Sequence, residues 1–250
     1  MESLTQKLGI QTMNDTQFSQ RFKDINGLTW LPWVGVDYLL EQNKILVLGE
    51  SHYCYNNYMP RDIEADKDET IKVVTDYAEK GRDAGNQYKT YEQMDAILRQ
   101  VFYPNARRQD IWSKIAFMNI VQKCMDNNQA RPQWQDFLSG WQVILQVINV
   151  LKPDVCLCFS TDKMHNRVNF NRLEEFKPQI PFDYSIQPTQ DTQKKISRCI
   201  VATPGGITIE NSKEVPVIFV QHASRIKNIN EWCKVIETYK EGDSFKKASH

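Results

Sequence analysis

The sequence lacks any long apolar run, and its first residues contain no basic patch followed by an apolar stretch. A membrane-spanning helix needs about 18 or more mostly apolar residues in a row, and a secretory leader needs the basic-then-apolar order. We therefore expect a cytoplasmic protein with no membrane partner. Repeats and low-complexity stretches are also missing, so nothing in the sequence supports a division into several domains.

Cysteines with metal-site spacing are missing too. The six cysteines are scattered along the chain, and no two of them form a CxxC pair. Zinc sites and iron-sulfur clusters commonly take their ligands from such pairs, so we expect no metal and no cofactor. The sequence predicts free thiols at all six positions, namely Cys54, Cys124, Cys156, Cys158, Cys199 and Cys233.

The chain has no excess of charge of either sign, because 31 basic residues balance 31 acidic ones. Binding to nucleic acid would therefore depend on a local basic face and not on the overall field. What the chain does have is the composition of an ordinary folded protein, with 41% hydrophobic and 25% charged residues among 250. That length supports a large buried core. We expect a single domain over residues 1–250 and a monomer.

Short buried strands and amphipathic helices alternate along the chain. The strands are β-branched and leucine-rich runs that are apolar on both faces, as in central parallel strands, at 44–48, 114–120, 154–159 and 215–220. Apolar residues recur at helical spacing in 91–102, 134–151 and 230–239. Because strands that alternate with helices pair in parallel through right-handed crossovers, the sequence predicts an α/β fold with a four-stranded parallel sheet.

Polar residues follow each of these strands. In open parallel sheets the ligand binds at the carboxyl ends of the strands, so these loops are the candidate site. The first loop is Gly49-Glu50-Ser51-His52-Tyr53, the second strand ends at Asn119, and the last loop is His222-Ala223-Ser224-Arg225.

These three blocks resemble the motifs of the uracil-DNA glycosylase superfamily. ILVLGESHY is similar to the water-activating loop typified by GQDPY or GEAPG, KIAFMNIV to the strand that ends in a base-reading Asn, and VIFVQHAS to the HPS motif. The resemblance covers about residues 31–239 in short blocks. It implies a three-layer α/β/α sandwich around a four-stranded parallel sheet. It also implies an enzyme that hydrolyses the N-glycosidic bond of a flipped uracil or modified pyrimidine in DNA, in repair or in defence against phage DNA.

The first motif departs from the family in an informative way. The Asp or Asn that most members use to activate water falls on Ser51, and the Pro that follows it falls on His52. A serine hydroxyl cannot act as a base at neutral pH, so the proton acceptor is Glu50 or His52, of which we favour Glu50. The departure also favours an unusual substrate base.

The resemblance gives roles to the other residues. His222 would stabilise the departing base anion, and Asn119 would pair with the edge of the flipped base. Tyr53 or Tyr55 would form a wall of the substrate pocket beside Gly49. The remaining two residues of the last loop, Ser224 and Arg225, are suited to binding backbone phosphate.

Simpler interpretations remain open for each residue. His222 could be a buried structural histidine, Asn119 a turn former, and Glu50 with Ser51 the start of a helix. Two other functions also remain open. One is a hydrolase with Ser51 as nucleophile and His222 as base, although GESHY lacks the second glycine of a GxSxG elbow. The other is a nucleic-acid or nucleotide binder that keeps the pocket without catalysis.

Overall fold

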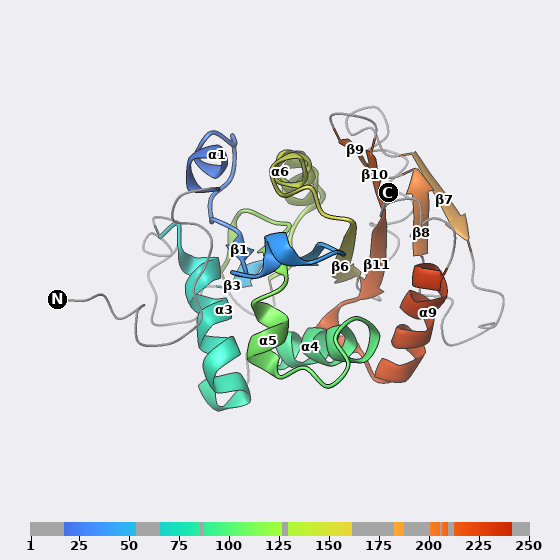
Figure 1. Ribbon diagram of the computed structural model, residues 1–250. Helices are drawn as coiled ribbons and strands as arrows, with labels where there is room; N and C mark the ends of the chain where they lie inside the picture. The colour runs from blue at the N-terminus through green and yellow to red at the C-terminus, as the bar shows by residue number, and fades with distance from the viewer. Residues whose placement is uncertain are drawn as a thin grey trace.

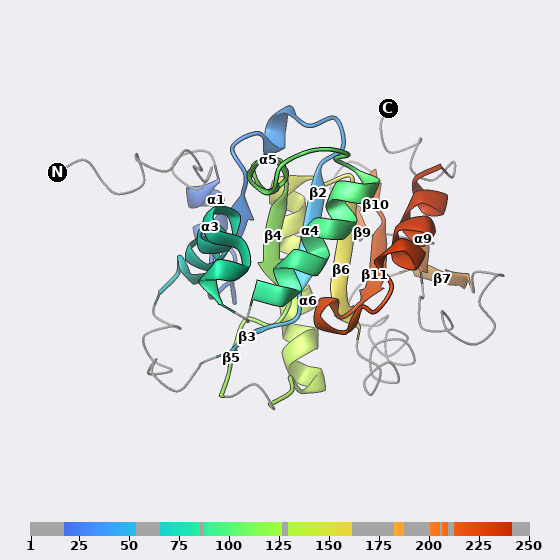
Figure 2. The same ribbon diagram turned by 90° about the horizontal axis from the view of Figure 1, so that it is seen from below.

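A central five-stranded sheet organises the computed structural model, which describes residues 18–53, 66–85, 88–126, 130–161, 183–187, 201–205, 207–209 and 213–241. The strand order is β1-β4-β2-β6-β11. The strand bounds are β1 (Trp33–Val34), β2 (Ile45–Gly49), β4 (Ala116–Asn119), β6 (Val155–Thr161) and β11 (Val217–Gln221). The last four run parallel to one another, and Figure 2 shows them side by side.

The four parallel strands confirm the strands expected from the sequence, but the sheet has one strand more than we expected. The additional strand, β1, pairs antiparallel with the outer side of β4. It has only two residues, so it is too short to give the apolar run by which the other four are recognised. The fold is therefore mixed α/β with a central, mostly parallel sheet.

Alternate residues of each parallel strand face opposite sides of the sheet, as the two-residue period of a strand requires. In β2, Leu46 and Leu48 belong to one buried cluster, while Ile45 and Val47 belong to the other. The other parallel strands divide in the same way between the two clusters. Both faces of the sheet are therefore buried, which explains why the strand sequences are apolar throughout.

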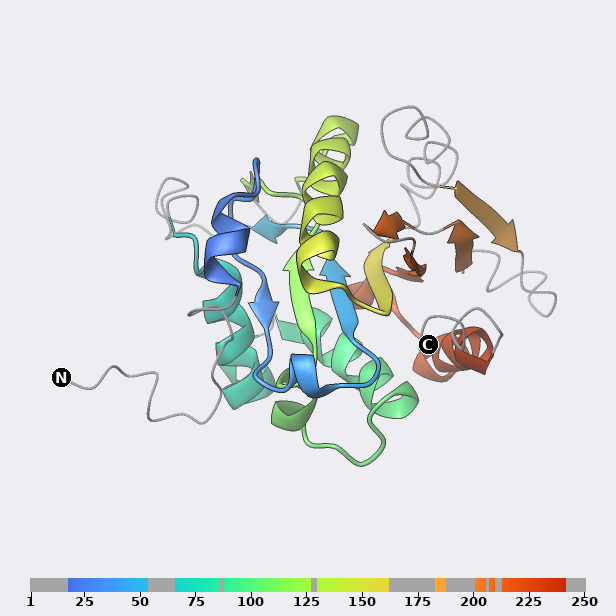
Figure 3. The same cartoon turned by 45° about the horizontal axis from the view of Figure 1, so that its top comes forward.

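Helices cover both faces of the sheet (Figures 1 and 3). The first cluster includes residues of α1 (Ser19–Lys23) and α6 (Trp134–Leu151). The second includes residues of α3 (Glu69–Lys80), α4 (Lys89–Val101), α5 (Arg108–Trp112) and α9 (Ile229–Glu241). Helices α4, α6 and α9 were expected from their apolar spacing, whereas α1, α3 and α5 were not.

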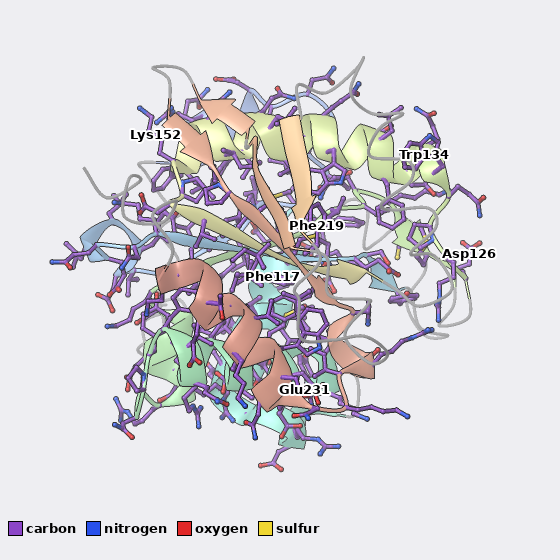
Figure 4. All side chains as sticks on the ribbon, turned by 90° about the vertical axis from the view of Figure 1, so that its right-hand side faces the viewer. Phe117, Asp126, Trp134, Lys152, Phe219 and Glu231 are labelled. Atoms are coloured by element: carbon purple, nitrogen blue, oxygen red, sulfur yellow. The ribbon has the colours of Figure 1, made fainter. Side chains whose placement is uncertain are left out.

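The end of α6 shows how the sequence terminates an element. Lys152 caps the helix in the left-handed region at φ 50°, and its N–H donates to the Ile148 carbonyl at 2.7 Å. Pro153 follows, which disfavours helical geometry at the residue before it. The chain then enters β6 directly. In Figure 4, Lys152 and Trp134 mark the opposite ends of α6, and Asp126 lies toward the Trp134 end.

Smaller elements complete the described part of the chain. Three two-stranded pairs lie outside the main sheet: β3 (His52–Tyr53) with β5 (Cys124–Met125), β7 (Asp183–Gln187) with β8 (Val201–Gly205), and β9 (Ile207–Ile209) with β10 (Lys213–Val215). Short 3₁₀ helices are η3 (Tyr38–Leu40), η4 (Gly81–Ala84) and η6 (Ala223–Arg225). Within the described ranges, no helix has the length and apolarity needed to cross a membrane.

Among the described cysteines, one differs from the expectation of free thiols. Cys124, on β5, is disulfide-bonded, so the expectation of free thiols is wrong there. Cys156, Cys158 and Cys233 are buried free thiols, as expected. A disulfide requires two cysteines to approach in space, and their positions in the sequence do not reveal this.

The order of the strands singles out the end of β2. From β2 the chain crosses over α3, α4 and α5 to β4 on one side, and then over α6 to β6 on the other side of β2. Ligands of open α/β sheets bind in the crevice at such a switch in direction, at the carboxyl ends of the strands. The loop that begins at Glu50 lies at this position.

Candidate functional site

The three sequence blocks lie at the same edge of the sheet. Gly49 ends β2, Asn119 ends β4 and Gln221 ends β11, and all three strands run in the same direction. Neighbouring strands are about 4.8 Å apart, so the end of β11, two strands from β2, is about 10 Å from it. The described part of the chain therefore brings the predicted blocks together.

Gly49 and Asn119 are partners in the parallel register of β2 and β4. A Cβ on residue 49 would overlap the Oδ1 atom of Asn119 and would stand 3.1 Å from the ring of Phe117. Only glycine lets the Asn119 side chain lie across the end of β2. Asn119 is 6% exposed, and we find no hydrogen bond from its side-chain amide to another described residue. The amide is therefore held in place by packing and keeps its donor and acceptor.

Gln122 fixes the loop that follows Asn119. Its Nε2 donates to the Asn119 carbonyl at 2.7 Å, and its Oε1 accepts from the Thr29 N–H at 3.1 Å. The Thr29 hydroxyl donates in return to the Gln122 carbonyl at 2.7 Å. These bonds join two segments that are 93 residues apart in the sequence. The end of β4 is thus tied to the segment that leads into β1.

Glu50 is a buried carboxylate, 8% exposed, and directly follows β2 at this edge of the sheet. The Tyr53 hydroxyl donates to Glu50 Oε1 at 3.3 Å, and Arg131 Nη1 donates to the same hydroxyl oxygen at 3.4 Å. Burial, followed by the negative charge of Glu50, raises the pKa of the Tyr53 phenol. Tyr53 therefore stays protonated at neutral pH and acts as a donor to the carboxylate.

His52 faces a different set of groups. Its Nε2 lies 2.9 Å from the Thr70 hydroxyl on α3, and its ring packs edge-on against Trp30 at 4.7 Å between centroids. Burial lowers the pKa of His52 to about 4, so the ring is neutral at physiological pH. These contacts join β3 to α3 and to the segment before β1. Between the two candidate bases, they favour Glu50.

His222 directly follows β11 and caps η6. Its Nδ1 accepts from the Ser224 backbone N–H at 3.3 Å and lies 2.8 Å from the Ser224 hydroxyl. Because a backbone N–H can only donate, Nδ1 is the acceptor nitrogen, and in the neutral ring the proton is on Nε2. His222 is only partly buried, so it is not the buried structural histidine of the simpler interpretation.

The remaining candidate residues have less defined positions. The Ser51 hydroxyl is buried, and within the described residues it has no hydrogen-bond partner. No helix begins at Ser51, because β3 follows it, so the helix-start interpretation is wrong. Arg225 lies at the end of η6, with its N–H bonded to the His222 carbonyl at 2.8 Å. Tyr55 lies outside the described residues.

Sequence reasoning missed two residues of this site, Arg131 and Gln122. Both lie in loops without a recognisable motif, and both act on residues far away in the sequence. A basic residue shortly before the α6 pattern was the only available signal for Arg131. Among the described residues, no group of three or more His, Cys, Asp or Glu side chains is placed to hold a metal ion.

Comparison with known proteins adds no assignment. No protein-family model matches the chain, and no curated protein matches it. The functional argument therefore depends on the residues at the carboxyl ends of β2, β4 and β11.

Proposed function

We propose that the chain is a divergent uracil-DNA glycosylase-like enzyme that releases uracil or a modified pyrimidine from DNA. The observation that carries the proposal is the convergence at one sheet edge of a buried carboxylate, an amide and a histidine, from three parallel strands. This matches the three chemical tasks of the reaction. The base must be held, the sugar cation must be stabilised, and the departing base must be neutralised.

Cleavage of the bond between base and sugar develops positive charge on the sugar and negative charge on the leaving base. In the proposed mechanism, Glu50 stabilises the sugar cation and orients the attacking water. The hydrogen bond from the Tyr53 hydroxyl to Glu50 Oε1 supports this role, since it helps to fix the orientation of the carboxylate.

His222 in the proposed mechanism donates from Nε2 to an oxygen of the leaving base. The engagement of Nδ1 by Ser224 supports this role, because it fixes both the tautomer and the ring orientation. A donor that meets developing negative charge typically lowers the activation free energy by about 3 to 4 kcal/mol. Asn119, which offers one donor and one acceptor, reads the base edge.

The experiment that tests the proposal measures base release from DNA oligonucleotides that carry uracil or modified pyrimidines. Glu50→Gln and His222→Ala should each lower release about 100-fold or more. Glu231→Gln, at the start of α9, is the matched carboxylate control and should keep wild-type activity. Because Cys124 is disulfide-bonded and the proposed location is the cytoplasm, the assay should be run with and without reductant. If no base is released from any substrate in either condition, the proposed glycosylase activity is refuted.

The contacts give less support to the serine-hydrolase alternative. A Ser nucleophile needs a hydrogen bond to its base, yet His222 Nδ1 engages Ser224, and the Ser51 hydroxyl has no partner within the described ranges. The non-catalytic alternative predicts binding of pyrimidine DNA without base release. Asn119→Ala should weaken that binding, so a binding assay on the same oligonucleotides separates it from the enzyme.

A further inference from the structure

A cavity lies in the helical layer, and none of its lining residues belongs to the loops at the strand ends. It has a volume of about 630 Å³ and is bounded by α3, η4, α4, the loop after α4 and α5. Figure 2 shows α3, α4 and α5 together on this side of the sheet. Its volume lies in the range typical of small-molecule sites, about 300 to 1,000 Å³. We call this cavity the arginine groove.

Three arginines line the arginine groove, one from each of three elements: Arg82 of η4, Arg99 of α4 and Arg108 of α5. Two carboxylates, Glu92 and Asp95 of α4, also line it. Counting these five side chains alone, three positive charges and two negative ones leave an excess of one positive charge. The groove therefore favours an anion even though the whole chain has no net charge.

The contacts of the arginines leave the groove rich in donors. Arg99 Nη2 donates to Asp95 Oδ2 at 2.7 Å, while Arg82 Nε is 3.6 Å from Glu92 Oε2, beyond hydrogen-bond distance. A guanidinium has five N–H groups. Across the described part of the chain, most of the N–H groups of these arginines have no protein acceptor.

Arg108 gives the groove a fixed wall. Its Nε donates to the Ala78 carbonyl at 3.0 Å and its Nη2 to the Glu79 carbonyl at 3.1 Å, so it is anchored to the last turn of α3. Its Nη1 lies against Gly81, where a Cβ would clash with it. Arg82 and Arg99, in contrast, have half-exposed side chains and can turn toward a ligand.

We propose that the arginine groove binds a small molecule that carries a phosphate group. Guanidinium groups on several sides match the several outer oxygens of a phosphate, whereas a carboxylate offers two oxygens in one plane to a single arginine. Inorganic phosphate alone would fill a small part of 630 Å³, so the natural ligand has a further group beside the phosphate. The site is independent of the proposed base-release chemistry.

Calorimetric titration of the full chain at low salt tests the inference, with inorganic phosphate, ribose 5-phosphate and acetate as probes. We expect both phosphates to bind, acetate to bind more weakly, and ribose 5-phosphate to bind at least as well as inorganic phosphate. The double variant Arg82→Gln/Arg99→Gln should weaken phosphate binding by roughly tenfold or more. Both side chains are half-exposed, so the fold should survive, and circular dichroism checks this.

Arg107→Gln is the matched control. Arg107 precedes Arg108 in the chain and pairs with Asp110, but its exposed side chain does not line the groove. It should leave phosphate affinity unchanged. The inference is overturned by an absence of phosphate binding to the wild type, by an equal loss in Arg107→Gln, or by acetate binding as tightly as phosphate. The base-release assay is separate, so its failure does not affect this result.

Discussion

The Oδ1 atom of Asn119 occupies the space that a Cβ on residue 49 would need. The two residues are register partners at the ends of neighbouring parallel strands. The absence of a side chain at position 49 thus determines where the amide of Asn119 lies. Backbone freedom does not explain this glycine, since it is a steric requirement imposed by its neighbour.

Gly49→Ala should therefore destabilise the protein by about 1 to 3 kcal/mol, because the added methyl group overpacks the end of β2. Urea denaturation measures the free energy of unfolding of the variant and of the wild type. In an Asn119→Ala background the same substitution should cost much less, since the clashing amide is gone. An equal cost in both backgrounds would mean that the two side chains do not compete for this space.

Ser224→Ala removes the hydroxyl at His222 Nδ1 but keeps the backbone N–H that also bonds to it. A neutral hydrogen bond contributes about 0.5 to 1.5 kcal/mol, so kcat for base release should fall by about two- to tenfold with KM unchanged. If Ser224 instead binds DNA phosphate, KM should rise and its salt dependence should become weaker. Steady-state kinetics at two salt concentrations separates the two roles.

Tyr53→Phe removes the hydrogen bond to Glu50 and the phenol that Arg131 contacts. We expect the variant to fold, and its kcat for base release to fall several-fold because the carboxylate loses its fixed orientation. In a Glu50→Gln background the substitution should cause little additional loss. A full additional loss would show that Tyr53 acts on the substrate directly.

The lowered pKa of His52 predicts how the stability of the protein depends on pH. Its pKa is lowered to about 4 in the folded state, below the ordinary value of 6.5, because burial disfavours the charged ring. The unfolded chain therefore binds a proton first, and stability is lost as the pH falls from about 6.5 toward 4. The loss amounts to about 3 kcal/mol at most.

The test measures the free energy of unfolding at neutral pH and near pH 4.5, about half a unit above the lowered pKa. His52→Gln should show a smaller fall between the two conditions than the wild type, each relative to its own value at neutral pH. The variant will be less stable at neutral pH because it loses the packing against Trp30. The same fall in both proteins would show that His52 is not the residue responsible.

The sequence was sufficient for the elements that form the core. Strands such as β2 and β6 are apolar runs ended by glycine or preceded by proline, and α6 shows a long helical pattern. Helix α3 was missed because its buried positions include Thr70 and Ala78, which are too weakly apolar to form a clear stripe. Its burial depends on the helices and strands around it.

The site was predictable where it follows strand ends and unpredictable where it depends on distant contacts. The location of Glu50, Asn119 and His222 at one edge of the sheet could be predicted because the carboxyl ends of parallel strands meet there. Arg131 lies 78 residues from Tyr53 in the sequence, and no local pattern around it predicts their contact. The disulfide at Cys124 was not predicted for the same reason.

The two residues of β1 pair with the outer side of β4, at one edge of the main sheet. Trp33 and Val34 are fully buried and pair with the outer side of β4. They thereby cover backbone groups that would otherwise form a template for strand addition. A chain shortened to begin at residue 35 should aggregate faster on heating than the full chain, as light scattering would show. We therefore expect β1 to protect this edge of β4 from pairing with strands of other molecules.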